Sequence, residues 1–136
     1  MGFDLHGISP VKTTSNAIDP DSFEGWKEDA EAGIYFRNNV WYWRPLWEYV
    51  AIVCDDILTL KDYKYGQSND GYIIEAEKAI NIGERLRISL AEGHYDKIVE
   101  EINENVPSIA KDYTFDKENV EEFANFCINS GGFSIC

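Results

Sequence analysis

The chain has 136 residues, of which 44% are hydrophobic and 14% aromatic, so it has enough apolar side chains for one core and too many for a disordered protein. The 25 acidic side chains outnumber the 12 basic ones, and the formal net charge of −13 argues against direct DNA binding, which requires Lys and Arg against phosphate. We therefore expect one acidic domain over residues 1–136, whose charge either keeps it soluble or attracts a partner with a basic surface.

Both ends of the chain predict short β-strands. Phe3 and Leu5 alternate with polar residues near the N-terminus, and Phe133 and Ile135 do the same near the C-terminus. An alternation with a period of two is typical of a strand that is buried on one face. We expect the two terminal strands to meet in one small sheet.

Residues 9–33 follow the first strand and contain two Pro and two Gly among Ser, Thr, Asn and Asp. This composition predicts a loop-rich segment, with room for a short acidic helix over about 23–32. Such a segment could be mobile or could fold over a site.

Hydrophobic periodicity predicts helices in the rest of the chain. The first begins at Pro45, which suits the first turn of a helix, and fades by Thr59. A polar, turn-rich stretch over residues 61–72 follows it. The other helices span about 74–92, 95–105 and a final stretch that Asp116 caps. The fold class is therefore α+β and mostly helical, with about four helices and a small sheet formed by the N- and C-terminal strands.

Cysteine usage and the start of the chain indicate a compartment. Cys54 and Cys127 lie among apolar residues at helical spacing, which predicts buried free thiols, and no Cys spacing matches a zinc module. Free thiols suit a reducing compartment. The chain shows no signal-peptide pattern and no apolar run long enough to span a bilayer, so we expect a cytoplasmic protein without membrane contact.

The most informative segment is YFRNNVWYWRPLWEYV, residues 35–50, in which seven of sixteen residues are aromatic. Aromatic rings stack on nucleobases, Arg binds phosphate in a bidentate manner, and Asn can read a base edge. The mixture predicts a site for a nucleotide or another phosphate ligand, although aromatic side chains can also serve as core alone. Read as an extended strand, the segment places on one face Tyr35, Arg37, Asn39, Trp41 and Trp43.

The candidate ligand-binding residues divide by role. An indole ring would stack a base, Arg37 and Arg44 would hold phosphate, and Asn side chains would read polar edges. The turn at residues 68–71 could add an amide and a carboxylate at the rim of the site, or could be ordinary turn chemistry without a function. The candidates are Tyr35, Arg37, Asn38, Asn39, Trp41, Trp43, Arg44, Trp47, Asn69 and Asp70.

No catalytic constellation accompanies this segment. His6 and His94 are far apart in the sequence, no nucleophile lies in a recognisable elbow, and no glycine-rich loop could cradle a phosphate. We expect a binding protein and not an enzyme, with no cofactor and no metal site. The enzymatic alternative, a nuclease or phosphodiesterase, would need His and carboxylate side chains clustered around a metal.

Three blocks of the sequence resemble a widespread family of small phage and bacterial proteins. They are the opening MGFDLHG, the block YFRNNVWYWRPLWEYV with the later SNDG, and the ending FDKENVEEFANFCINSGGFSIC. Members begin MGFDL or MGMDV, carry YFRNNVWWWRPLW and close on a helix followed by SGGF, so that Tyr42 stands where a Trp is usual. Some members carry paired-Cys insertions that look zinc-binding, and because this chain lacks them no metal is implied.

The resemblance implies a phage-type origin, and small phage proteins of this kind often counter host defences. The leading hypothesis is a sponge that sequesters a cyclic nucleotide immune signal in the host cytoplasm without cleaving it, with a homo-oligomer as one way to enclose the ligand. The alternative is an acidic inhibitor that binds a host defence protein, where the negative surface could mimic nucleic acid.

Overall fold

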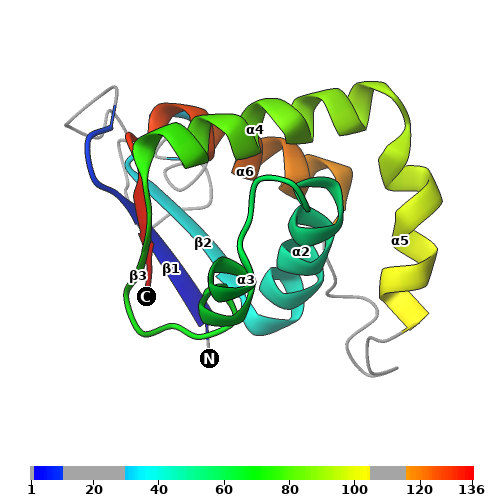
Figure 1. Cartoon of the computed structure of the whole chain (residues 1–136), viewed down its shortest axis with the longest axis horizontal. Coiled ribbons are helices and arrows are strands. Elements are labelled where there is room, and N and C mark those ends of the chain that lie inside the picture. Colours follow the sequence, from blue (N-terminus) through cyan, green and yellow to red (C-terminus); the bar gives the residue numbers. More distant parts are fainter. Residues whose placement is uncertain (1, 11–29, 105–115) are drawn as a thin grey trace.

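The computed structural model describes residues 2–10, 30–104 and 116–136 (Figure 1). Within these ranges the protein has an α+β fold that is mostly helical, with five helices and four strands. The predicted fold class is therefore confirmed. The loop-rich segment predicted over residues 9–33 lies largely outside the described residues.

The four strands form one antiparallel sheet in the order β2-β1-β4-β3. β1 (Gly2–Gly7) pairs with β2 (Tyr35–Asn39) on one side and with β4 (Phe133–Ile135) on the other, and β3 (Tyr72–Ile74) pairs with β4. The first and last strands of the chain are therefore neighbours, as their alternating patterns predict. Because Phe3 and Leu5 are buried and His6 is exposed, one face of the sheet carries the core and the other faces outward.

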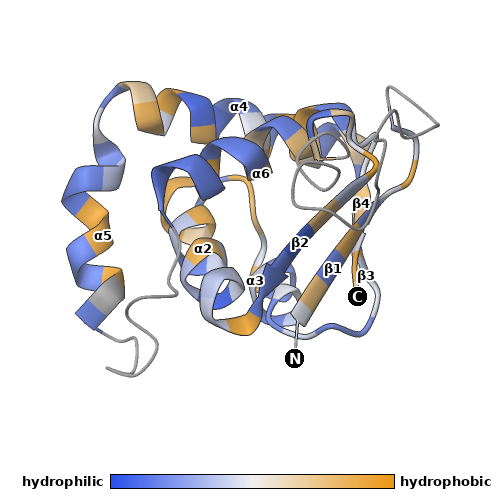
Figure 2. Cartoon of the chain, turned by 180° about the vertical axis from the view of Figure 1, so that it is seen from behind, coloured by the Kyte–Doolittle hydropathy of each residue, from blue (hydrophilic) through white to orange (hydrophobic). Residues whose placement is uncertain are grey.

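The helices pack on the buried face of the sheet and on one another. α4 and α6 lie against each other along their length, and Gly83 permits the close approach, since a Cβ there would lie 2.5 Å from Ile128 Cγ1. Figure 2 shows hydrophobic and hydrophilic stretches alternating along these helices. None of the helices in the described ranges has both the length and the apolarity that crossing a bilayer requires. The helices are α2 (Val40–Val53), α3 (Leu60–Gly66), α4 (Ala76–Ala91), α5 (His94–Glu104) and α6 (Lys117–Asn129).

An aromatic cluster joins the sheet to α2 and α6. Trp43 of α2 stacks on Phe3 of β1 with ring centroids 5.5 Å apart, and meets Phe123 of α6 edge to face at the same distance. Phe123 also contacts Phe36 and Phe133 of the sheet. Offset and edge-to-face pairs of this kind add roughly 0.5–1.5 kcal/mol each beyond the apolar area that they bury. The cluster therefore fixes α2 relative to the sheet.

Two sequence-based predictions about helices are wrong. The first helix begins at Val40 and not near Pro45, because the side chain of Asn39 accepts a hydrogen bond from the backbone N–H of Tyr42 at 2.9 Å and so caps an earlier start. The helix ends at Val53, before the predicted end near Thr59. Pro45 therefore lies inside α2. The stretch over residues 61–72 is not all turn, since it contains most of α3.

α3 forms because its first turn satisfies its own backbone. The Thr59 side chain accepts from the N–H of Asp62 at 3.1 Å, and the Asp62 carboxylate accepts from the N–H of Thr59 at 2.9 Å. This reciprocal capping box removes two unpaired donors from a helix that is too short to show hydrophobic periodicity.

Candidate ligand-binding groove

A half-open groove of about 680 Å³ lies where α2, α3 and α5 meet. Its volume falls in the range of ligand sites, roughly 300–1,000 Å³. α2 supplies one wall as a stripe with helical spacing, which extends about 16 Å from Trp41 to Ile52 at 1.5 Å per residue. The lining side chains are Val40, Trp41, Arg44, Pro45, Glu48, Ile52, Tyr63, Gln67, Glu101 and Ile102.

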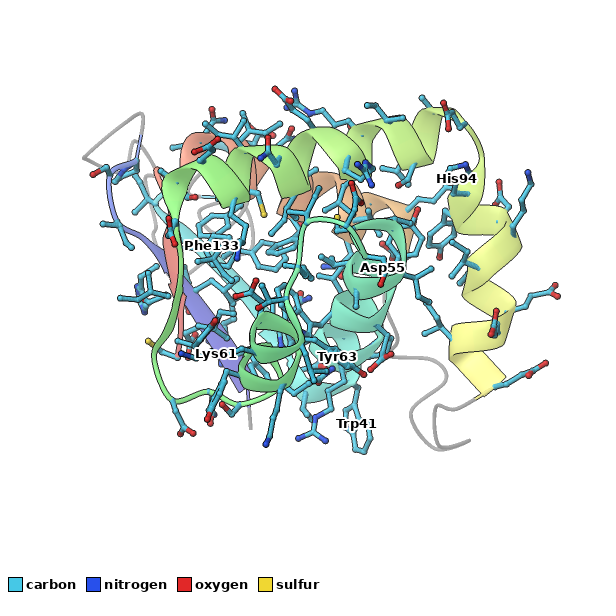
Figure 3. All side chains as sticks on the ribbon, in the orientation of Figure 1. Trp41, Asp55, Lys61, Tyr63, His94 and Phe133 are labelled. Atoms are coloured by element: carbon cyan, nitrogen blue, oxygen red, sulfur yellow. The ribbon has the colours of Figure 1, made fainter. Side chains whose placement is uncertain are left out.

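Trp41 stands at the N-terminal end of this stripe. In Figure 3 its indole projects away from the body of the molecule, on the same side as Tyr63 of α3. The side chain is 42% exposed, whereas Trp43 and Trp47 on the opposite face of α2 are fully buried. Trp41 is therefore the tryptophan of α2 with an open ring face, which is the feature that a flat ligand needs for stacking.

Arg44 follows Trp41 by three residues, so both side chains lie on one face of α2. Arg44 is exposed and lines the groove. No hydrogen bond or ion pair joins its guanidinium to another of the described residues. The donors of Arg44 are therefore available to a carboxylate or phosphate from outside the chain.

Glu48 lies one turn beyond Arg44 and is oriented from α3. Its Oε1 accepts a hydrogen bond from the hydroxyl of Tyr63 and a second from Gln67 Nε2 at 3.3 Å. The hydrogen bond to Glu48, burial and the charge of Glu48 raise the pKa of Tyr63 above 10.0, so the hydroxyl keeps its proton and remains the donor. Among the described residues, Oε2 of Glu48 has no partner. The α2 wall of the groove thus presents one oriented carboxylate oxygen.

The buried carboxylate of Asp62 holds α3 in place. Asp62 accepts from the Tyr72 hydroxyl of β3 at 2.6 Å, from Lys78 Nζ of α4 at 2.6 Å and from the backbone of Thr59. Its side chain is 5% exposed, and that of Lys78 is 25% exposed. Because Tyr63 follows directly in sequence, this network also fixes the side chains of α3 that reach the groove.

The extended strand that was expected to carry the binding residues on one face ends at Asn39. The chain is extended over residues 35–39 and helical from Val40 onward, so Arg37 and Asn39 do not share a strand face with Trp41 and Trp43. That part of the prediction is wrong because the Asn39 cap starts α2 inside the aromatic block.

Trp43 and Trp47 are fully buried and pack in the core. Their rings stack at 5.2 Å, and their indole N–H groups donate to the backbone oxygens of Gly66 at 2.8 Å and Tyr63 at 3.1 Å. A Cβ at Gly66 would lie 2.3 Å from the Trp47 ring. These two indoles hold α3 against α2 and present no open face.

Arg37 and Tyr35 lie on the outward face of the sheet, away from the groove lining. The Tyr35 hydroxyl donates to Asp4 Oδ1, and Arg37 Nε lies 3.8 Å from the same oxygen. Burial, together with the hydrogen bond to Asp4 and its charge, raises the pKa of Tyr35 to about 12. Arg37 and Arg44 therefore do not meet in one cavity.

The remaining polar candidates have structural partners or lie at the surface. Asn38 is buried and exchanges two amide hydrogen bonds with Asn119 of α6, at 3.2 and 2.9 Å. Asn39 caps α2. Asn69 Nδ2 lies 3.4 Å from the backbone oxygen of Gly2, and Asp70 is exposed. Of the predicted candidates, the groove lining includes Trp41 and Arg44.

Glu48, Tyr63 and Gln67 were missed as site residues by sequence reasoning. Tyr63 and Gln67 fall in the stretch that the sequence predicts to be polar and turn-rich, and Glu48 in the predicted helix looks like an ordinary exposed acid. The Thr59–Asp62 capping box was the signal that could have revealed α3. Nothing local marks Glu101 and Ile102, because α5 reaches the groove only through tertiary packing.

None of the cysteines belongs to the groove lining. Cys54 and Cys127 are buried and free, as predicted, and Cys136 is exposed. Burial raises the pKa of the Cys54 thiol to about 12. The described residues contain no group of three or more His, Cys, Asp or Glu side chains placed to hold a metal ion.

Comparisons of the chain with protein-family models, with curated proteins and with solved structures found no match. The groove and its side chains are therefore the basis for a functional assignment.

Proposed function

We propose that this protein binds a small anionic ligand, a nucleotide, in the groove between α2, α3 and α5, without transforming it. The observation that carries the proposal is the pair Trp41 and Arg44. An open indole and a guanidinium without a partner among the described residues lie three residues apart on one wall of a ligand-sized groove. Stacking of a base on an aromatic ring contributes roughly 1–3 kcal/mol, and Arg binds phosphate oxygens through two parallel hydrogen bonds.

The charges of the lining limit what the ligand can be. The groove lining contains one cationic side chain, Arg44, and two carboxylates, Glu48 and Glu101. A ligand with several clustered phosphates would meet two like charges for one opposite charge, at an unfavourable Coulomb energy. The groove therefore suits a ligand whose negative charge near this wall is one phosphate, with neutral hydrogen-bond donors near the acids.

A phosphodiester or cyclic nucleotide has this charge distribution. In a phage setting, which the sequence resemblance implies, such a protein would act as a sponge that lowers the free concentration of a cyclic nucleotide immune signal in the host cytoplasm. A homo-oligomer would allow two copies to cover a ligand from both sides.

Calorimetry with a panel of mononucleotides, cyclic mononucleotides, and cyclic di- and trinucleotides tests the proposal. We expect at least one cyclic or phosphodiester-linked member to bind, and to be recovered intact by chromatography after incubation with the protein. Absence of heat and of any thermal shift across the whole panel would contradict nucleotide binding. Recovery of a cleaved product would contradict binding without catalysis.

A second candidate is an acidic inhibitor that binds a host defence protein. The groove extends along α2, with exposed apolar side chains at Trp41 and Ile52 and the acid Glu48 between them, and its lining also includes Glu101 of α5. A basic amphipathic helix of a partner could lay its apolar face into such a groove. Recovery of one dominant host partner in a pull-down, lost with Trp41→Ala and Ile52→Ala, would favour this candidate over the nucleotide.

A further inference from the structure

Only one of the two carboxylate oxygens of Glu48 accepts hydrogen bonds from the described residues that line the groove. Oε1 is held by Tyr63 and Gln67, which fixes the plane of the carboxylate, while Oε2 has no partner in the described part of the chain. A partly buried, oriented acceptor favours a ligand that brings a hydrogen-bond donor to that point, because an unmatched charged acceptor loses solvation without compensation.

The order of side chains along α2 indicates which donor this is. Trp41, Arg44, Glu48 and Ile52 follow one another at intervals of three, four and four residues along one wall. A base stacked on Trp41 would place its phosphate next along the helix, at Arg44. The group attached to the other side of that phosphate would then lie at Glu48. In a dinucleotide this group is the second ribose, and the second base follows beside the apolar side chain of Ile52.

We infer that the groove binds a phosphodiester-linked ribonucleotide, linear or cyclic, and that Glu48 Oε2 selects ribose over deoxyribose by accepting from the 2′-hydroxyl. The inference rests on the proposed function and assigns its ligand class. A carboxylate is a common partner of a ribose 2′-hydroxyl in nucleotide sites, and this hydroxyl is the group that distinguishes RNA-type from DNA-type ligands. The length of the wall, about 16 Å from Trp41 to Ile52, suits two nucleoside units better than one.

The test compares 3′,5′-linked cyclic diadenylate with its 2′-deoxy analogue, and linear diadenylate with linear deoxydiadenylate, by calorimetry. The wild-type protein should bind at least one ribose form roughly 10- to 100-fold more tightly than its deoxy counterpart, which is the effect of one hydrogen bond to a charged group. The linear and cyclic pairs show which form of the ligand the groove accepts.

Glu48→Gln replaces the carboxylate with an amide of the same shape. It should reduce the preference for ribose to about threefold or less, since a neutral acceptor makes a weaker hydrogen bond. Glu84→Gln, an exposed acid of α4 outside the groove lining, is the matched control and should leave the preference unchanged.

Equal binding of the ribose and deoxyribose forms by the wild-type protein would overturn this inference and leave the proposed function standing. Retention of the full preference in Glu48→Gln would also overturn it. If neither form of either probe binds, and no other nucleotide does, the proposed function fails as well. The wild-type comparison depends on no variant, so it decides the matter even if Glu48→Gln is poorly folded.

Discussion

Trp41 and Trp43 are two residues apart in α2, and packing gives their rings different environments. Trp43 is fully buried against Phe3 and Trp47, whereas Trp41 is 42% exposed on the groove wall. A helix turns by 100° per residue, so a spacing of two directs side chains to nearly opposite faces. The same residue type therefore stabilises the core at one position and is available to a ligand at the other.

The proposed function predicts that removal of the side chain of Trp41 or of Arg44, which both line the groove, should weaken nucleotide binding. We expect Trp41→Ala to lower affinity by about 5- to 150-fold, from loss of 1–3 kcal/mol of stacking. Arg44→Ala should lower it by about tenfold or more, from loss of a charge-assisted contact with phosphate. Titration calorimetry measures both. Arg87→Ala removes an exposed Arg of α4 outside the groove and should change affinity by less than about twofold, within the range of surface substitutions.

The Asp62 carboxylate contributes to the stability of the fold and makes that stability depend on pH. Burial alone would raise the pKa of this carboxyl, but donors from Lys78, Tyr72 and Thr59 outweigh burial and hold the pKa below the ordinary 3.8. A depressed pKa in the folded state means that the stabilisation is fully present above about pH 4 and is lost as the pH falls through the folded pKa.

Asp62→Asn should therefore lower the free energy of unfolding by about 3 kcal/mol at neutral pH, because it leaves Lys78 without its buried partner. The difference in the free energy of unfolding between wild type and variant should shrink as the pH is lowered below about 4, where the wild-type carboxylate becomes protonated and loses its charge. Urea unfolding at several pH values measures the difference. Asp55→Asn, an exposed acid of the turn after α2, is the control, and an equal loss in both variants would contradict the role of the network.

At the scale of elements, α3 is a short helix that depends on its neighbours. Its capping box starts it, the Asp62 network ties it to β3 and α4, and the indole N–H groups of Trp43 and Trp47 donate to its backbone. Isolated helices of this length are unstable in water, so these tertiary contacts supply most of its stability. Since α3 carries Tyr63 and Gln67, its docking also shapes the groove.

Gly66→Ala should destabilise the protein even though Ala favours helix more than Gly does. The new methyl carbon would lie 2.3–2.5 Å from atoms of the Trp47 indole, which is fully buried and cannot move aside. Overpacking of this kind costs roughly 1–3 kcal/mol of stability. We expect this cost to outweigh the gain of about 1 kcal/mol from the higher helix propensity of Ala. Chemical denaturation measures the change. Lys64→Ala in the same helix should stay within about 0.5 kcal/mol, and a Gly66→Ala protein as stable as wild type would contradict the packing.

At the scale of the whole molecule, the net charge of −13 acts on every approaching ligand. A nucleotide carries the same sign, so long-range repulsion slows its approach, while a basic protein partner would be attracted. Salt shortens the range of both effects, from about 30 Å at 0.01 M to about 10 Å at 0.1 M. The two candidate functions therefore predict opposite responses to ionic strength.

For a nucleotide ligand, the association rate constant should rise as salt increases over this range, because screening removes the repulsion. Stopped-flow tryptophan fluorescence can follow it, with exposed Trp41 as the reporter. A neutral nucleoside, the control ligand, should show little dependence on salt. A basic protein partner should instead associate more slowly in higher salt, and a falling rate for the nucleotide would argue against net repulsion as the dominant long-range force.

Elements with a repeated local pattern were predictable from the sequence. α4, α5 and α6 show apolar spacing over ten or more residues, and β1 and β4 alternate, so hydrophobic burial alone determines their type and their buried faces. The sequence predicts the start of α2 near Pro45, which is favoured in a first turn, whereas the Asn39 cap starts the helix at Val40, five residues earlier. α3 was missed because one capping box is a weaker signal than a run of polar residues.

The sequence by itself determined the acidic charge, the α+β class, the free buried thiols and the presence of aromatic and Arg side chains in one block. Only the tertiary structure decided which of those side chains face a groove, separating Trp41 and Arg44 from Trp43, Trp47 and Arg37. The physical reason is that each segment's residue pattern reports only on that segment, whereas the groove forms only when α3 and α5 pack beside α2. Those contacts join segments that no local pattern connects.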